Sequence, residues 1–192
     1  CHHILILNHP EIMSALSALL SEYKALPAVS QRAVAAIVGA AVGDAASRPA
    51  HWVYDRSTLE TKIGKSNPEF WPVSLSPFYT IPTGRRSCYN DEAFSMLRSL
   101  PAYPAVYDKQ ATRSSLLRTF AVDSEYADAM ARRVVAYHPS QKDVKKEPIE
   151  GPWQQGAVTS YLKAVAANEE ITGETSNVET DGFCLSLPLV AR

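Results

Sequence analysis

Residues 82–100 have the sequence PTGRRSCYNDEAFSMLRSL, which places an amide and two acids at the expected start of a helix. Asn90 is a favoured N-cap residue. Asp91 and Glu92 would then lie in the first turn, where free backbone N–H groups and the helix dipole favour negative charge. The same three side chains are also of the type that binds Mg²⁺, which prefers carboxylate and neutral oxygen ligands together with water. This stretch alone therefore predicts either an ordinary helix start or one side of a cation site.

A second stretch, residues 39–52, has the sequence GAAVGDAASRPAHW. Together the two stretches resemble the ADP-ribosylglycohydrolase family, whose members carry a G-x-x-x-G-D-x-x-G-x-x-x-E stretch and, further along the chain, a T-D-D-T motif. Gly39, Gly43 and Asp44 match the first motif, and residues 90–93 (NDEA) lie where the second is expected. The shorter runs HWVYD, NPEFW, PFY, IPTGR and SCY between residues 51 and 89 are similar to the branch that contains the J-type lens crystallins and selenoprotein J. The resemblance extends from about Val34 to the end of the chain.

The resemblance implies a reaction and a metal ion. Members of the family hydrolyse ADP-ribosyl glycosidic bonds, so the implied substrate is small-molecule or protein-linked ADP-ribose. The implied cofactor is Mg²⁺, which can orient the substrate and act as a Lewis acid. Asn90, Asp91 and Glu92 stand at the positions of metal ligands, and Asp91 and Glu92 are also the candidate catalytic groups.

The candidate substrate-binding residues implied by the resemblance are Asp44, His51 and Tyr89, but the sequence departs from the family pattern. His51 stands where the family has a glutamate. Glu92 replaces an aspartate and reaches one methylene further, which Mg²⁺ tolerates poorly because it demands near-ideal octahedral geometry. The D-x-D-[ST] motif that completes the family's site is absent from these 192 residues. We therefore expect a degenerate site.

These departures leave more than one function open. The first is weak or lost ADP-ribosylglycohydrolase activity at Asp91 and Glu92. The second is a non-catalytic, crystallin-like protein that has a structural role or binds ADP-ribose. A third, redox chemistry at Cys88, rests only on similarity to the selenoprotein branch, since a lone cysteine is more often a small buried hydrophobic residue.

Composition indicates a globular protein without a strongly charged partner. Hydrophobic residues make up 46% of the chain and charged residues 20%, and the formal net charge is -1. Nucleic-acid and anionic-membrane partners normally require a basic excess, so we predict neither. The longest apolar run, residues 33–42, is too short to span a bilayer. The three cysteines are far apart without metal-site spacing, which favours a reducing, cytoplasmic setting.

Local signals predict a series of helices. Asn8 is expected to begin the first, which ends at Pro27, and Ser30 to cap the second. Asp55, Asp108 and Ser124 are expected to begin three more, and apolar spacing over residues 153–165 marks another. Residues 67–86 contain four prolines, so we expect an irregular segment there, held by buried aromatic rings or acting as a lid over a ligand.

The fold class predicted from these elements is all-α, and the resemblance implies an orthogonal multi-helix bundle. Residues 34–42 are apolar on every side, which predicts a central and nearly buried helix. We interpret residues 1–192 as a single, incomplete domain, because the apolar run 183–190 lies close to the C-terminus without a polar tail. Because the first residue is Cys1 and the first methionine is Met13, residues 1–12 are a candidate non-native extension.

Overall fold

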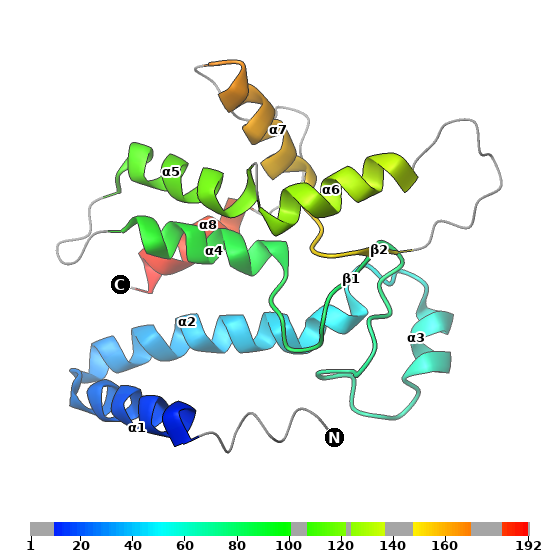
Figure 1. The fold of residues 1–192 in the computed structure, drawn as a ribbon. Helices are drawn as coiled ribbons and strands as arrows, with labels where there is room; N and C mark the ends of the chain where they lie inside the picture. Colours follow the sequence, from blue (N-terminus) through cyan, green and yellow to red (C-terminus); the bar gives the residue numbers. More distant parts are fainter. Residues whose placement is uncertain (1–9, 101–106, 122–123, 137–147, 170–181, 192) are drawn as a thin grey trace.

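The computed structural model describes residues 10–100, 107–121, 124–136, 148–169 and 182–191. In chain order its elements are α1 (Pro10–Ala25), α2 (Ala28–Ser47), the 3₁₀ turn η2 (Arg48–Ala50), α3 (Arg56–Lys62), β1 (Tyr79–Thr80), α4 (Cys88–Ser99), α5 (Lys109–Phe120), α6 (Glu125–Ala136), β2 (Ile149–Glu150), α7 (Gly156–Ala166) and α8 (Gly182–Val190). Figure 1 shows α4 to α8 on one side of α2 and α1 on the other. The prediction of an all-α fold is confirmed.

The two strands form one short parallel pair. Tyr79 pairs with Ile149 and Thr80 with Glu150, so the irregular segment 67–86 is joined to a distant part of the chain. Tyr79 and Ile81 are buried on this segment, whereas Phe70 and Phe78 are partly exposed. Aromatic burial therefore holds the segment in place through Tyr79.

Helix starts that depend on local sequence are predicted correctly. Asp55 accepts hydrogen bonds from the backbone of Ser57 and Thr58 at the start of α3. Asp108 does the same for Gln110 and Ala111 at the start of α5. Each carboxylate satisfies free N–H groups of the first turn. These two predictions are confirmed because the capping residue and the groups it caps are neighbours in sequence.

Two other predicted caps are wrong. Helix α2 begins at Ala28, with Pro27 in the N-cap position, so Ser30 lies inside the helix. Helix α4 begins at Cys88, with Ser87 at the N-cap, so Asn90 is the third helical residue. Asn8, predicted to begin α1, lies outside the described residues.

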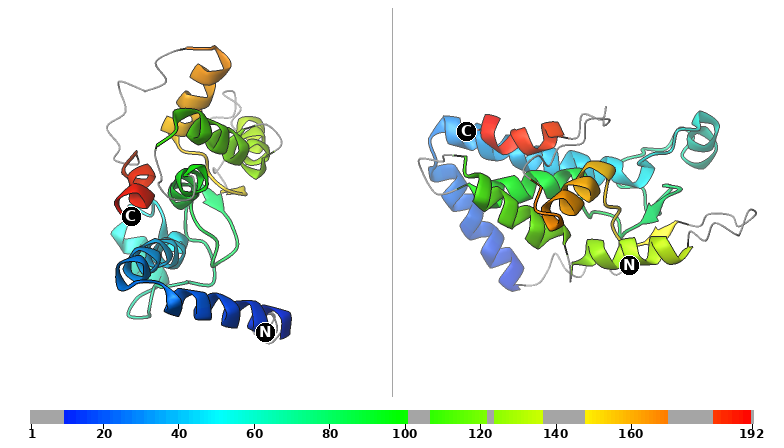
Figure 2. Two further views of the ribbon diagram at one scale, coloured as in Figure 1. Left: turned by 90° about the vertical axis from the view of Figure 1, so that its left-hand side faces the viewer. Right: turned by 90° about the horizontal axis from the view of Figure 1, so that it is seen from above.

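The core has two clusters above α2. One is formed by Cys88, Leu116, Phe120, Tyr126 and Val158, and Leu185 of α8 packs against it. The other surrounds Tyr79, with Ile81, Ala129 and Ile149 buried beside it. Helix α4 is the central element because both α5 and α8 pack against it. The views in Figure 2 agree that α4 lies between α2 and α5.

The prediction that residues 34–42 form a central, buried helix is wrong. The helix forms, but Val34, Val38 and Val42 are 38%, 55% and 52% exposed. Helix α2 reaches the core mainly through its C-terminal end, where Ala45 is buried and where Asp44 binds Ser87 at the start of α4. An apolar pattern on all sides does not bury a helix unless other elements cover every side.

None of the helices in the described ranges is long and apolar enough to cross a membrane.

Candidate functional site

The first predicted motif meets the second at the start of α4. Asp44, near the end of α2, accepts a hydrogen bond from the Ser87 backbone N–H at 2.6 Å. It accepts another from the Ser87 hydroxyl at 2.5 Å. The first turn of α4 follows directly, since the Asp91 N–H donates to the Ser87 carbonyl. The structure therefore brings Asp44 next to Ser87, the N-cap of the helix that carries Asn90, Asp91 and Glu92.

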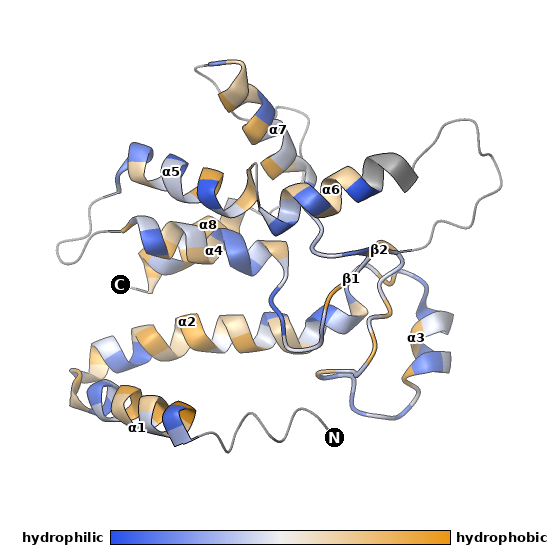
Figure 3. Ribbon diagram, in the orientation of Figure 1, coloured by the Kyte–Doolittle hydropathy of each residue, from blue (hydrophilic) through white to orange (hydrophobic). Residues whose placement is uncertain are grey.

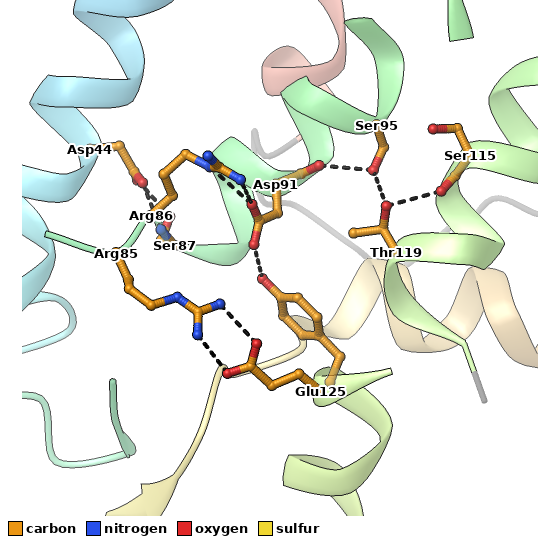
Figure 4. A network of polar contacts seen from close by, with 10 residues as sticks. Asp44, Arg85, Arg86, Ser87, Asp91, Ser95, Ser115, Thr119 and Glu125 are labelled. Atoms are coloured by element: carbon orange, nitrogen blue, oxygen red, sulfur yellow. Dashed lines mark hydrogen bonds and ion pairs between the residues drawn. The ribbon is translucent and has the colours of Figure 1, made fainter. Parts of the chain in front are cut away.

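Asp91 is the centre of a compact polar group, which we name the Asp91 cluster: Asp91, Arg86 and Tyr126. Arg86 donates to Asp91 Oδ1 from Nη2 at 2.8 Å and from Nε at 3.1 Å. The Tyr126 hydroxyl donates to Asp91 Oδ2 at 2.8 Å. Figure 4 shows both carboxylate oxygens of Asp91 engaged in this way. Burial, and then the Asp91 charge, raise the pKa of Tyr126, so this hydroxyl stays protonated and donates.

Glu92 points to a different part of the protein. Its side chain is 2% exposed, and Gln155, the N-cap residue of α7, donates from Nε2 to Glu92 Oε1 at 2.9 Å. Asn90 is also buried, and within the described ranges its Oδ1 has no hydrogen-bond partner. The three candidate metal ligands therefore differ. Asp91 is hydrogen-bonded to α6 and Glu92 to the start of α7, whereas Asn90 has an oxygen without a partner among the described residues.

His51 and Tyr89 lie together in an aromatic group that includes Trp52, Tyr79 and Trp153. The His51 and Tyr89 rings are 6.1 Å apart, and the Tyr79 hydroxyl lies 3.3 Å from His51 Nδ1. Burial lowers the pKa of His51, although the nearby Asp44 charge opposes this shift. Trp52 adopts a left-handed backbone (φ 60°), which is uncommon for a side chain of this size. Edge-on contacts from Trp52 to four other rings, including Tyr79 and Trp153, hold this conformation.

Arg48 is a functional candidate that the motif comparison misses. It is fully buried in η2, and its Nη2 donates to the Pro82 carbonyl at 3.2 Å. Among the described residues its Nε and Nη1 have no hydrogen-bond partner. Burial lowers the pKa of Arg48, and the charges of Tyr79 and Asp44 oppose that shift. Arg48 therefore links the first stretch, to which it belongs, to Pro82 at the beginning of the second.

The geometry does not fit the Mg²⁺ site that the motifs imply. In the part of the chain that the structure describes, no group of three or more His, Cys, Asp and Glu side chains could hold a metal ion. Asp44, Asp91 and Glu92 instead bind Ser87, the Arg86–Tyr126 pair and Gln155. A Mg²⁺ ion needs several oxygens converging on one point, whereas these carboxylates are directed at separate protein donors. The Asn90 oxygen, which has no partner among the described residues, favours a ligand there.

Most of the partners in this region were not predicted from sequence. Arg86 carries a local signal, since a cation five residues before Asp91 lies close to it at a helix start. Tyr126 and Gln155 carry none, because they come from α6 and the start of α7. Cys88 is buried among these groups, and burial, with the Glu92 charge, raises the pKa of its thiol. A raised thiol pKa gives little thiolate, which is typical of a structural cysteine.

Comparison with known proteins identifies relatives but no family model. No protein-family model matches the chain, and no solved structure gives a significant match. Crystallin J1A of Tripedalia cystophora is 31% identical over 161 residues, which cover 83% of this chain and 46% of that protein. Crystallin J1B of the same organism is 30% identical over 164 residues, which cover 85% of this chain and 47% of that protein. The chain thus spans about half the length of the curated relatives it matches, and over most of its own length it is similar to J1-type crystallins.

Proposed function

We propose that this protein is a crystallin-like, non-catalytic protein in which the predicted acid site holds helices together. The observation that carries the proposal is the engagement of Asp91 by protein donors, since its two carboxylate oxygens accept three hydrogen bonds from Arg86 and Tyr126. The similarity to two proteins named crystallins supports the same conclusion.

The energetics of the Asp91 cluster oppose metal binding. A hydrogen bond to a charged group contributes about 1.5–3 kcal/mol. A Mg²⁺ ion that took Asp91 as a ligand would have to compensate for the lost Tyr126 bond and would bring a positive charge close to Arg86. Glu92 would in addition have to leave a buried position beside Gln155. We therefore place these acids in the structural framework, where they connect α2, α4, α6 and the start of α7.

A weak ADP-ribose-binding or hydrolytic function is the second candidate, and two observations favour it. Asp44, Asp91 and Glu92 are all close enough to Cys88 to influence its pKa, and Asn90 in the same turn has a buried oxygen without a partner among the described residues. A substrate pyrophosphate could supply ligands that the chain lacks. Binding without turnover would then survive.

The test combines calorimetry with a hydrolysis assay. Titration with ADP-ribose, with and without Mg²⁺, measures binding, and an ADP-ribosylated peptide reports turnover. We expect no Mg²⁺-dependent turnover, and we expect chelation of divalent cations to leave thermal stability unchanged. Glu125→Ala is the matched control, because this exposed acid pairs with Arg85 outside the Asp91 cluster. Turnover that Asp91→Ala abolishes and Glu125→Ala preserves would contradict the proposal, and binding without turnover would support the second candidate.

A further inference from the structure

Arg48 is a buried charge that forms no ion pair with the described residues. Its side chain is fully buried, and Nη2 donates to the Pro82 carbonyl, while Nε and Nη1 have no hydrogen-bond partner in the described ranges. Each ion pair found there joins an acid to Arg56, Arg85 or Arg86 instead. Arginine is almost never fully buried unless it is paired. The guanidinium group of Arg48 therefore requires an anionic partner.

The surroundings of Arg48 on its own side of the chain are apolar. Figure 3 shows mainly hydrophobic residues along α2, whose C-terminal end leads into η2. Ala45, one turn before Arg48, and Pro49, which follows it, are both buried. A charged group in such an environment loses its hydration without gaining polar neighbours, and this loss is costly unless a counter-charge is present.

Asp44 is the acid whose charge acts on Arg48, but its carboxylate is bound elsewhere. Its Oδ2 accepts from the Ser87 N–H and its Oδ1 from the Ser87 hydroxyl. Ser87 is the N-cap residue of α4, so a turn of Asp44 towards Arg48 would break the contacts that join α2 to this helix start. Burial is the largest influence on the pKa of Arg48 and lowers it, and the Asp44 charge opposes this shift only in part.

A water molecule would satisfy the free N–H groups of Arg48 but not its charge. The guanidinium group does not lose its proton in proteins, so Arg48 cannot become neutral when it is buried. Its planar arrangement of donors matches carboxylates and phosphates, whose oxygens accept parallel N–H bonds. A small oxyanion is therefore the ligand whose chemistry fits this group.

Segment 70–82 encloses the position of Arg48 and limits the size of such a ligand. The Phe70 N–H donates to the Ala46 carbonyl at 2.9 Å, and the Leu75 N–H donates to the Pro49 carbonyl at 2.7 Å. The bond from Arg48 to Pro82 adds a third connection. Figure 1 shows the chain between α3 and α4 passing beside the C-terminal end of α2. An ion at Arg48 would be closed in by this segment, so the segment must open locally before the ion can enter.

We propose that Arg48 binds a small oxyanion, a phosphate ion or a carboxylate, enclosed between η2 and segment 70–82. The ion neutralises the guanidinium group and thereby stabilises the packing of this segment on the end of α2. The site differs from the Asp91 cluster, because its donor comes from η2 and not from α4 or α6. The inference does not rest on the proposed function, since a non-catalytic protein can bind an anion, and its test uses neither Mg²⁺ nor an ADP-ribosyl substrate.

The test is calorimetric titration of the whole chain with sodium phosphate and, separately, with sodium acetate, while sodium chloride holds the ionic strength constant. We expect one ion per chain, bound in the millimolar range or more tightly. The midpoint of thermal unfolding should rise over the same concentrations, because a ligand of the folded state stabilises it. Arg48→Met should weaken binding at least about 10-fold. This variant is expected to fold, because replacing a buried charge by an apolar side chain of similar length is often neutral or stabilising.

Two further variants keep the test specific. Arg56→Met makes the same change at an arginine whose side chain is 90% exposed, and it should bind the ion as the wild type does. Arg48→Lys keeps the charge but lacks the planar set of donors, so it should bind about 10-fold more weakly and also serves if Arg48→Met does not fold.

The outcomes separate the two sources of the oxyanion and the ways in which the proposal fails. Binding of phosphate alone would assign the site to a phosphate group, and binding of acetate alone to a carboxylate; either result supports the proposal. Absence of binding to the wild type would overturn it, as would unchanged binding to Arg48→Met or Arg48→Lys. Equal stabilisation by sodium chloride would show a general effect of salt and would overturn it as well.

Discussion

Replacing Asp91 by alanine should destabilise the protein by about 2–4 kcal/mol. The estimate has two parts. Tyr126 is 4% exposed, so loss of its acceptor removes a bond to a charged group worth about 1.5–3 kcal/mol and leaves a buried hydroxyl unpaired. The Arg86 side chain is 36% exposed, so its ion pair with Asp91 contributes only about 0.2–1 kcal/mol because water screens it.

The assay is urea unfolding followed by circular dichroism, with Arg85→Ala as the matched control. Arg85 also forms two short bonds to a carboxylate, at 2.7 and 2.8 Å to Glu125. Their side chains are 44% and 48% exposed, however, so breaking this pair should cost no more than about 1 kcal/mol. The two Arg–carboxylate pairs have similar N···O distances, so the difference between their losses of unfolding free energy reports the effect of burial and of the Tyr126 hydrogen bond.

A double-mutant cycle completes the experiment. Tyr126→Phe removes the same hydrogen bond from the other side, so the free energy of coupling between Asp91→Ala and Tyr126→Phe should be about 1.5 kcal/mol or more. Equal or greater stability of Asp91→Ala relative to the wild type would refute the reasoning. Such a result would mean that the carboxylate is kept at a cost in stability, as catalytic groups often are.

Three further predictions concern other parts of the chain. Burial lowers the pKa of His51 in the folded protein, so the unfolded chain binds a proton first as the pH falls. The free energy of unfolding should therefore decline from about pH 6.5 downward. Between about pH 7.5 and about pH 5 this decline should be smaller for His51→Gln than for the wild type. Cys88, whose pKa is raised by burial, should react with iodoacetamide more slowly than the partly exposed Cys184, and equal rates measured by peptide mass spectrometry would contradict this. Gly151→Ala should destabilise by more than about 1 kcal/mol, because Gly151 has φ 110° and an added Cβ would lie 2.7 Å from a guanidinium nitrogen. Gly156→Ala, where the space is open, should be neutral or stabilising in the same unfolding assay.

The sequence predicts what depends on near neighbours. Asp55 and Asp108 are recognisable as caps because the N–H groups they bind lie two and three residues away. The predicted start of α4 is wrong because the acid that binds the N-cap residue Ser87 is Asp44, which lies 43 residues earlier in the chain. A local pattern cannot show such a partner, and Asn90 therefore resembles a cap that it is not.

The sequence indicates which segments meet at the start of α4 but not the partners of the acids there. The paired motifs predict that residues 90–92 lie near Asp44 or His51, and Asp44 binds Ser87 at the start of the helix that carries them. The partners of the acids determine what those acids can do, and Tyr126 and Gln155 come from distant elements. The burial predicted for residues 34–42 fails for a related reason, since apolar character shows what a helix can bury and not what covers it.

The short parallel pair of β1 and β2 has a consequence for the order of folding. The Thr80 hydroxyl and the Ile149 carbonyl are 69 residues apart in sequence, and closing a loop of that length costs about 4 kcal/mol in chain entropy. Two residues per strand cannot compensate for this cost, so the pair is expected to form only after α4, α5 and α6 have collapsed into the intervening core. The amides of Ile149 and Gly151, which donate to Phe78 and Thr80, would then gain protection from hydrogen exchange last during refolding.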